Sequence, residues 1–160
     1  MTTSASHSAQ RVQEALEGLG VSLQVEILPA STRSAQEAAQ AIGCKQGQIA
    51  KSLIFQTVTN GRPLLVIASG ANRVDEQVIA DQVGEPIHKA DADFVRRVTG
   101  FAIGGVPPVG HVQEIETYLD EDLLSYKYIW AAAGTPHAVF KLTGDILVQV
   151  TGGTVIRLAA

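Results

Sequence analysis

The feature that most constrains the fold is a pair of apolar runs joined by an Asn-Gly turn. Residues 49–55 (IAKSLIF) and 63–68 (PLLVIA) are both predominantly apolar, and Asn60-Gly61 lies between them. Asn-Gly between two such runs is a strong short-range hairpin signal, because both residues tolerate the positive φ angles of the turn. The pattern therefore predicts two adjacent antiparallel strands near the middle of the chain.

Short helices and strands are expected on both sides of this hairpin. Helical spacing and glycine stops predict helices over residues 10–19, 35–42, 74–83, 93–98, 122–125 and 144–151, with N-caps expected at Ser34 and Asp91. Further strands are expected over 21–28, 86–88, 115–119, 128–133, 138–142 and 155–158. Because strands do not alternate strictly with long helices, the sequence predicts an α+β fold with mostly antiparallel strands and several short helices.

Length and composition indicate one soluble, cytoplasmic domain. The 160 residues match the size of a single domain, and no apolar stretch approaches the roughly 18 residues of a membrane span. The N-terminus lacks the pattern of a secretory signal, so we expect residues 1–9 to be a frayed end and residues 10–160 to form the domain. The single cysteine, Cys44, excludes a disulfide framework and is expected to pack.

The charge balance limits the ways in which this chain could bind nucleic acid. Lys and Arg total 12 against 16 Asp and Glu, and aromatic residues make up 5% of the chain. A protein that wraps RNA normally has a basic excess, and a stacking platform for single strands needs aromatic side chains. Both are therefore disfavoured, whereas a site that holds one end of a polynucleotide remains compatible with this composition.

The most unusual stretch is the loop over residues 104–110 (GGVPPVG). Gly104 and Gly105 permit positive φ angles or a close approach to a ligand, and Pro107 and Pro108 stiffen the loop. One interpretation is a rigid structural turn. The other is a cradle whose N–H groups bind a carbonyl or phosphate oxygen.

Two further residues could carry chemistry. Lys51 lies within an apolar run, where it is either solvated at a strand edge or able to bind a phosphate or polarise an ester. His137 follows Gly134-Thr135-Pro136 in a predicted hairpin turn, where it is either exposed or a proton carrier. His88 and His111 lack a ligand-like spacing with it, so no metal site and no cofactor are predicted.

Three of these segments occur in one order that resembles a known family. IAKSL at residues 49–53, TGFAIGGVPPVG at 99–110 and AGTPH at 133–137 together are similar to the YbaK/EbsC family, also called the prolyl-tRNA-synthetase-associated editing domain. The resemblance extends from about residue 21 to the C-terminus. It implies a mixed, mostly antiparallel and partly closed sheet with surrounding short helices, and hydrolysis of the ester that joins a wrong amino acid to tRNA.

The resemblance also implies site residues and partners. Lys51 corresponds to the family's lysine and is expected to anchor the substrate, with His137 or a water that it positions assisting attack. Backbone N–H groups near Gly104 and Gly105 are expected to bind the ester carbonyl and its developing oxyanion. The substrate-binding residues implied are Ser52, Gly104, Gly105, Val106, Pro107, Gly110 and Gly134. The expected partners are the aminoacylated 3′ end of a tRNA and a prolyl-tRNA synthetase, without a membrane.

Three positions depart from the family members that clear cysteine. Those members carry a tyrosine, a serine and an aspartate where this chain has Leu28, Ala132 and Val139. With fewer polar groups at these positions, the chain resembles the branches of the family that clear alanine or a similar small aliphatic amino acid, with tRNA for proline as the expected carrier. Two alternatives stay open: a non-catalytic module that docks on tRNA or a synthetase, and a hydrolase of a free small-molecule ester.

Overall fold

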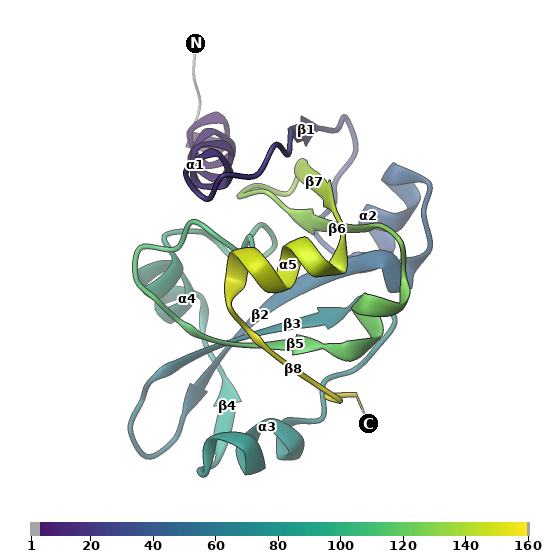
Figure 1. Cartoon of the computed structure of the whole chain (residues 1–160). Helices are drawn as coiled ribbons and strands as arrows, with labels where there is room; N and C mark the ends of the chain where they lie inside the picture. The colour runs from purple at the N-terminus through teal and green to yellow at the C-terminus, as the bar shows by residue number, and fades with distance from the viewer. Residues whose placement is uncertain (1–3, 160) are drawn as a thin grey trace.

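The computed structural model describes residues 4–159, which fold around one mixed sheet (Figure 1). The helices are α1 (Ser4–Gly18), α2 (Ala35–Ile42), α3 (Glu76–Val83), α4 (Ala92–Thr99) and α5 (Gly144–Thr151), with short 3₁₀ helices η1 (Gln46–Gln48) and η2 (Glu121–Ser125). The strands are β1 (Val25–Ile27), β2 (Ile49–Thr57), β3 (Pro63–Ser69), β4 (Ile87–Lys89), β5 (Glu116–Asp120), β6 (Ile129–Ala132), β7 (Ala138–Leu142) and β8 (Thr154–Ile156). Within this range no helix is both long and apolar enough to cross a membrane.

The strands form one sheet in the order β1-β7-β6-β2-β3-β5-β8, with β4 paired to β2. The predicted hairpin is confirmed: β2 and β3 pair antiparallel from Ala50 opposite Ser69 to Gln56 opposite Pro63. The β2–β6, β3–β5 and β5–β8 pairs are parallel, and the other four pairs are antiparallel. The mixed, mostly antiparallel α+β class predicted from the sequence is confirmed.

Both faces of β3 are buried, which explains its almost entirely apolar sequence. Leu65 and Ile67 of β3 join a core cluster with residues of α1, α4 and α5, whereas Leu64 and Val66 join a second cluster with Ile79 of α3. Successive side chains of a strand point to opposite faces, so β3 supplies both clusters. Figure 1 shows α3 lying apart from α1, α4 and α5 around the sheet.

Local capping explains why four helices of only eight residues are defined. Side-chain oxygens accept from the first turn of each helix, and each helix ends at a glycine with a positive φ angle. The N-caps of α2, α3, α4 and α5 are Ser34, Asp75, Asp91 and Thr143, and their C-caps are Gly43, Gly84, Gly100 and Gly152. The predicted caps at Ser34 and Asp91 are confirmed.

The N-terminal elements differ from the sequence prediction. Helix α1 begins at Ser4 rather than near residue 10, so residues 4–9 are helical where a frayed end was expected; residues 1–3 lie outside the described range. The predicted strand over 21–28 is reduced to three residues. The Gln13 side chain of α1 donates to the Leu23 carbonyl and accepts from the Val25 N–H, so a helix satisfies backbone groups that a longer strand would use.

The glycine-rich loop is held against two other segments. The Gly105 N–H donates to the Ala102 carbonyl across a turn with Gly104 at φ 96°, and the Gly105 carbonyl accepts from Gly134. A Cβ on Gly105 would lie 2.8 Å from the Thr135 nitrogen. The His111 imidazole Nε2 lies 2.7 Å from the Pro107 carbonyl. These contacts hold the loop against the turn at 134–135 and against His111.

Gly105→Ala should destabilise the protein because the new methyl group would collide with the backbone of the turn at 134–135. We expect a loss of about 1–3 kcal/mol in the free energy of unfolding, measured by urea denaturation. Gly18→Ala is the matched control, because no atom lies within 4 Å of a Cβ there, and it should be neutral or slightly stabilising. Equal stability of the two variants would contradict the close packing of the loop.

The stability of the loop anchor should depend on pH. Burial lowers the pKa of His111 below its ordinary value of 6.5, so between these two pKa values the unfolded chain binds the proton more readily. The contribution of neutral, buried His111 to the free energy of unfolding is therefore fully present above pH 6.5. It is lost as the pH falls through the lower pKa of the folded state. Thermal unfolding should show a larger loss between pH 7.5 and 5 for the wild type than for His111→Gln, and equal losses would refute this role.

Candidate functional site

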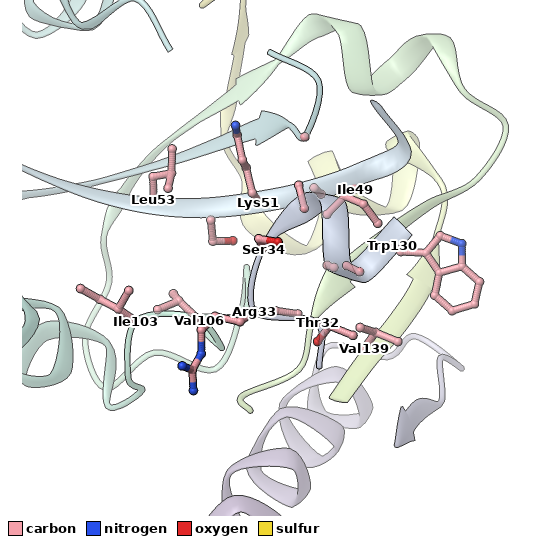
Figure 2. A pocket seen from close by; sticks show the side chains of 18 of the residues that line it. Thr32, Arg33, Ser34, Ile49, Lys51, Leu53, Ile103, Val106, Trp130 and Val139 are labelled. Carbon is pink, nitrogen blue, oxygen red and sulfur yellow. The ribbon is translucent and has the colours of Figure 1, made fainter. Parts of the chain in front are cut away.

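A cavity of about 610 Å³ lies where β2 and β6 separate. Its walls come from β2, from β6 and β7, from the start of α2, and from the loop that contains Ile103 and Val106. Figure 2 shows Thr32, Ser34, Val106 and Val139 below β2, which runs across the view. The cavity therefore brings together residues that lie more than 100 positions apart in the sequence.

The pairing pattern of β2 leaves part of its edge open to this cavity. Strand β6 pairs with β2 only at Ile49 and Ala50, and β4 pairs with it only from Phe55 to Thr57. The Ile54 carbonyl accepts from Ala90, on the side away from β3, and strand geometry places the N–H and C=O of Ser52 on that same side. Ser52 thus presents its main-chain polar groups to the cavity that it lines.

The hydroxyl of Ser52 adds a second polar group at this point. Its Oγ is buried and has no hydrogen-bond partner within the described part of the chain. A buried hydroxyl without a partner costs about 1–3 kcal/mol, so such groups are rare unless a ligand completes them. Ser52 therefore offers both a main-chain and a side-chain donor to a bound molecule.

Lys51 is held by a defined partner rather than solvated freely. Its Nζ donates to the Asn72 carbonyl at 2.7 Å, and Figure 2 shows the side chain extending upward from β2. The Asn72 side chain in turn donates to Asp120 at 2.8 Å and to Asp122 at 2.7 Å. An ammonium has three N–H donors, so two remain for a ligand. Burial, together with the nearby charge of Lys89, lowers the pKa of Lys51.

The cavity is cationic although the chain is acidic. Arg33, Lys51 and Lys89 line it, and none of its lining residues is Asp or Glu, whereas the whole chain carries a net charge of −4. Cations gathered around a partly enclosed site attract an anionic ligand. The arrangement fits a ligand with an apolar end and a phosphate.

Two of the three positions at which this chain departs from cysteine-clearing relatives are neighbours on adjacent strands in the cavity wall. Ala132 of β6 lies directly opposite Val139 of β7, and both line the cavity. Leu28 is not among the lining residues. The wall formed by Ala132 and Val139 is apolar and offers no side-chain hydrogen bond to a thiol or hydroxyl group.

The structure brings only part of the predicted site to this cavity. Lys51, Ser52, Gly104 and Val106 line it. The predicted residues that do not line it are His137, Gly105, Pro107, Gly110 and Gly134.

The missing residues serve the fold in other ways. The imidazole of His137 is exposed, and the main chain of His137 bonds to Leu28 and Thr135. Gly105 cannot supply the predicted oxyanion donor in this geometry, because its N–H already donates to Ala102. Gly110 lies against Ala15 of α1, where a Cβ would come within 3.3 Å of the alanine methyl.

The lining residues that were not predicted from the sequence include Arg33, Lys89 and Trp130. Each lies in a different segment, and no local pattern marks it. Cys44 packs against the cluster that contains α2, and burial raises the pKa of its thiol, so the thiolate needed for nucleophilic attack is disfavoured. Residues 4–159 contain no cluster of three His, Cys, Asp or Glu side chains able to hold a metal.

Comparison with known proteins connects this geometry to a family. The sequence model described as the aminoacyl-tRNA editing domain matches residues 29–150. EbsC of Enterococcus faecalis, named as a candidate Cys-tRNA(Pro)/Cys-tRNA(Cys) deacylase, is 29% identical over 124 residues, covering 75% of this chain and 73% of that protein. The proline–tRNA ligase of Limosilactobacillus fermentum is 28% identical over 54% of this chain, which corresponds to 16% of the ligase.

A solved structure agrees with this assignment. The crystal structure of a candidate trans-editing enzyme for prolyl-tRNA synthetase is 49% identical and superposes with a TM-score of 0.92, covering 100% of this chain and 99% of the other. The matched region contains the cavity, Lys51 and the glycine-rich loop. The chain belongs to the aminoacyl-tRNA editing domain family.

Proposed function

We propose that this protein is an aminoacyl-tRNA deacylase that acts in trans on tRNA for proline carrying alanine or another small aliphatic amino acid. The observation that carries the proposal is the cavity at the open edge of β2, which is lined by an unpartnered hydroxyl, by three cationic residues and by an apolar wall. The similarity to a named Cys-tRNA deacylase, to a proline–tRNA ligase and to a trans-editing enzyme supports aminoacyl-tRNA as the class of substrate. Editing is needed because one methylene group changes binding by only about 1–3 kcal/mol.

The apolar wall supports the choice of amino acid. Ala132 and Val139 give the cavity a surface that suits a methyl or ethyl side chain. A thiol or a hydroxyl placed there would lose its hydrogen bonds to water without finding a side-chain partner on this wall. The proposal therefore separates this protein from a deacylase whose preferred substrate is cysteinyl-tRNA.

The cations and Ser52 support the reaction. The two remaining Lys51 donors hold the terminal phosphate or the ester, and the Ser52 N–H and Oγ stabilise the negative charge that develops on the ester carbonyl oxygen. Water adds to the carbonyl carbon, and the bond between that carbon and the ribose oxygen breaks. The amino acid and the tRNA 3′ end, with its free hydroxyl, are released.

This mechanism differs from the sequence expectation in the oxyanion donor and in the role of His137. The sequence expectation placed the oxyanion donors near Gly104 and Gly105; Ser52 takes this role here, because the Gly105 N–H already bonds to Ala102. No proton transfer is assigned to His137, because its imidazole is exposed and does not line the cavity. His137→Ala is therefore expected to slow hydrolysis less than tenfold.

A panel of mischarged tRNAs tests the function directly. Release of labelled amino acid should be fastest for small aliphatic residues on tRNA for proline and at least tenfold slower for cysteine and leucine. No release from any charged tRNA would favour the docking-module alternative. Equal rates on a free amino-acid ester and on charged tRNA would favour the small-ester hydrolase.

Lys51→Ala should reduce deacylation by at least about a hundredfold, because the cavity loses the cation that is fixed at its β2 wall by Asn72. Circular dichroism should show an unchanged fold, since Lys51 is only half-buried. Lys45→Ala removes an exposed lysine that does not line the cavity and serves as the matched control. Wild-type turnover in Lys51→Ala would exclude the proposed role.

Ser52→Ala should separate activity from stability. The kcat is expected to fall at least about tenfold through loss of an oxyanion donor, while the free energy of unfolding stays equal or rises because the removed hydroxyl has no partner. Ser69→Ala is the matched control on β3: its hydroxyl donates to the Gly47 carbonyl, so stability should fall and kcat should not. If Ser52→Ala is destabilised with normal kcat, the Ser52 hydroxyl is structural.

A further inference from the structure

Two of the eight aromatic side chains of this chain lie close together near the cavity. Tyr128 and Trp130 lie two positions apart on β6 and its N-terminal extension, and Tyr128 is 39% exposed. Exposure alternates along residues 128–133, with Ile129, Ala131 and Ala133 buried between the more exposed positions. Tyr128, Trp130 and Ala132 therefore point to the same side of the strand.

Two lysines accompany these rings. The Lys141 Nζ lies 4.4 Å from the centre of the Tyr128 ring and 5.7 Å from that of Trp130, and the Lys127 Nζ lies 5.5 Å from the Tyr128 ring. The pairing of Trp130 with Lys141 across β6 and β7 fixes this arrangement. Neither lysine forms an ion pair with a carboxylate in the described part of the chain. We call Lys127, Tyr128, Trp130 and Lys141 the aromatic–lysine patch.

The patch is continuous with the cavity. Trp130 and Ala132 both line the cavity, whereas Tyr128 lies farther out on the same strand. Figure 2 shows the Trp130 ring at the outer edge of the lining residues, extending away from Val139 and Thr32. Same-side residues two positions apart are about 6.6 Å apart along a strand. The row of side chains thus leads from the open surface to the apolar wall.

We propose that the aromatic–lysine patch binds the unpaired nucleotides that precede the aminoacylated 3′ end of the RNA. Trp130 and Tyr128 stack on the bases, and Lys127 and Lys141 contact the phosphates. This proposal rests on the proposed function for the terminal residue in the cavity, and it adds the path of the strand outside it. It departs from the sequence expectation that the low aromatic content disfavours stacking.

The chemistry of the patch favours a single strand of RNA over a protein partner. Aromatic faces that alternate with lysines match the bases and phosphates of a polynucleotide, and stacking accepts any base. The lysines now lie over the rings, a weak contact at an exposed site, so an incoming base can displace them toward the phosphates. Five of the twelve lysines and arginines of this acidic chain lie in the cavity or the patch, and their positive charge attracts the RNA backbone to this route.

The sole tryptophan of the chain provides a direct readout. Titration with the tetranucleotide ACCA should quench Trp130 fluorescence, and the affinity should fall with increasing salt. Tyr128→Ala and Lys141→Gln should each weaken binding about fivefold or more, and Tyr128→Phe, which keeps the ring, should restore it. Arg157→Gln removes an exposed charge beside β8, at the opposite end of the sheet, and should bind as the wild type does.

Kinetics separate this proposal from the proposed function. Tyr128→Ala and Lys141→Gln should raise the KM for aminoacyl-tRNA about fivefold or more, with little change in kcat, and should not alter hydrolysis of an alanyl ester of adenosine. Deacylation with an unchanged KM and no quenching would overturn the patch but leave the function standing. Quenching by RNA without any deacylation would support the patch and refute the function. An effect of the variants seen only with a prolyl-tRNA synthetase present would identify a protein interface and overturn the proposal.

Discussion

The pairing of β2 with three different strands is the constraint on which the site depends. Strand β3 pairs with β2 along almost the whole length of β2, whereas β6 and β4 pair only with the two ends of β2. The middle of the strand therefore has one satisfied edge and one open edge. The open edge exposes Ser52 to the cavity, and the adjoining residue, Lys51, is held by Asn72. A sheet with regular pairing at this position would have neither the cavity nor the unpartnered donors.

The rest of the molecule keeps this edge open. The loop around Gly105 packs on the turn at 134–135 and is anchored again through His111, so the wall opposite β2 is rigid. Asp120, which is almost fully buried, accepts from Ser69 and from Asn72 and thereby fixes the segment that holds Lys51. A preorganised site of this kind aligns donors before the substrate arrives, which is the main requirement for electrostatic stabilisation of an oxyanion.

Local signals predicted most of the fold but only part of the site. The Asn60-Gly61 hairpin and the Ser34 and Asp91 caps depend on neighbouring residues, so the sequence contains the information for them. The separation of β6 from β2, and the meeting of Arg33, Lys89 and Trp130, depend on long-range pairing that no local pattern encodes. For His137, the local residues predicted the turn, but they could not predict whether the side chain points into the cavity. The direction of the side chain depends on how the turn packs against the rest of the chain.

The central claim is that the ester lies at the open edge of β2 with the amino acid against the apolar wall. A crystal structure with a non-hydrolysable amide analogue of alanyl-adenosine tests this most directly. We predict that the amide oxygen lies within hydrogen-bond distance of the Ser52 nitrogen or Oγ, and that the alanine methyl group contacts Ala132 and Val139. Binding of the amide oxygen by the loop at residues 104–106, with the Ser52 hydroxyl still unpartnered, would contradict it.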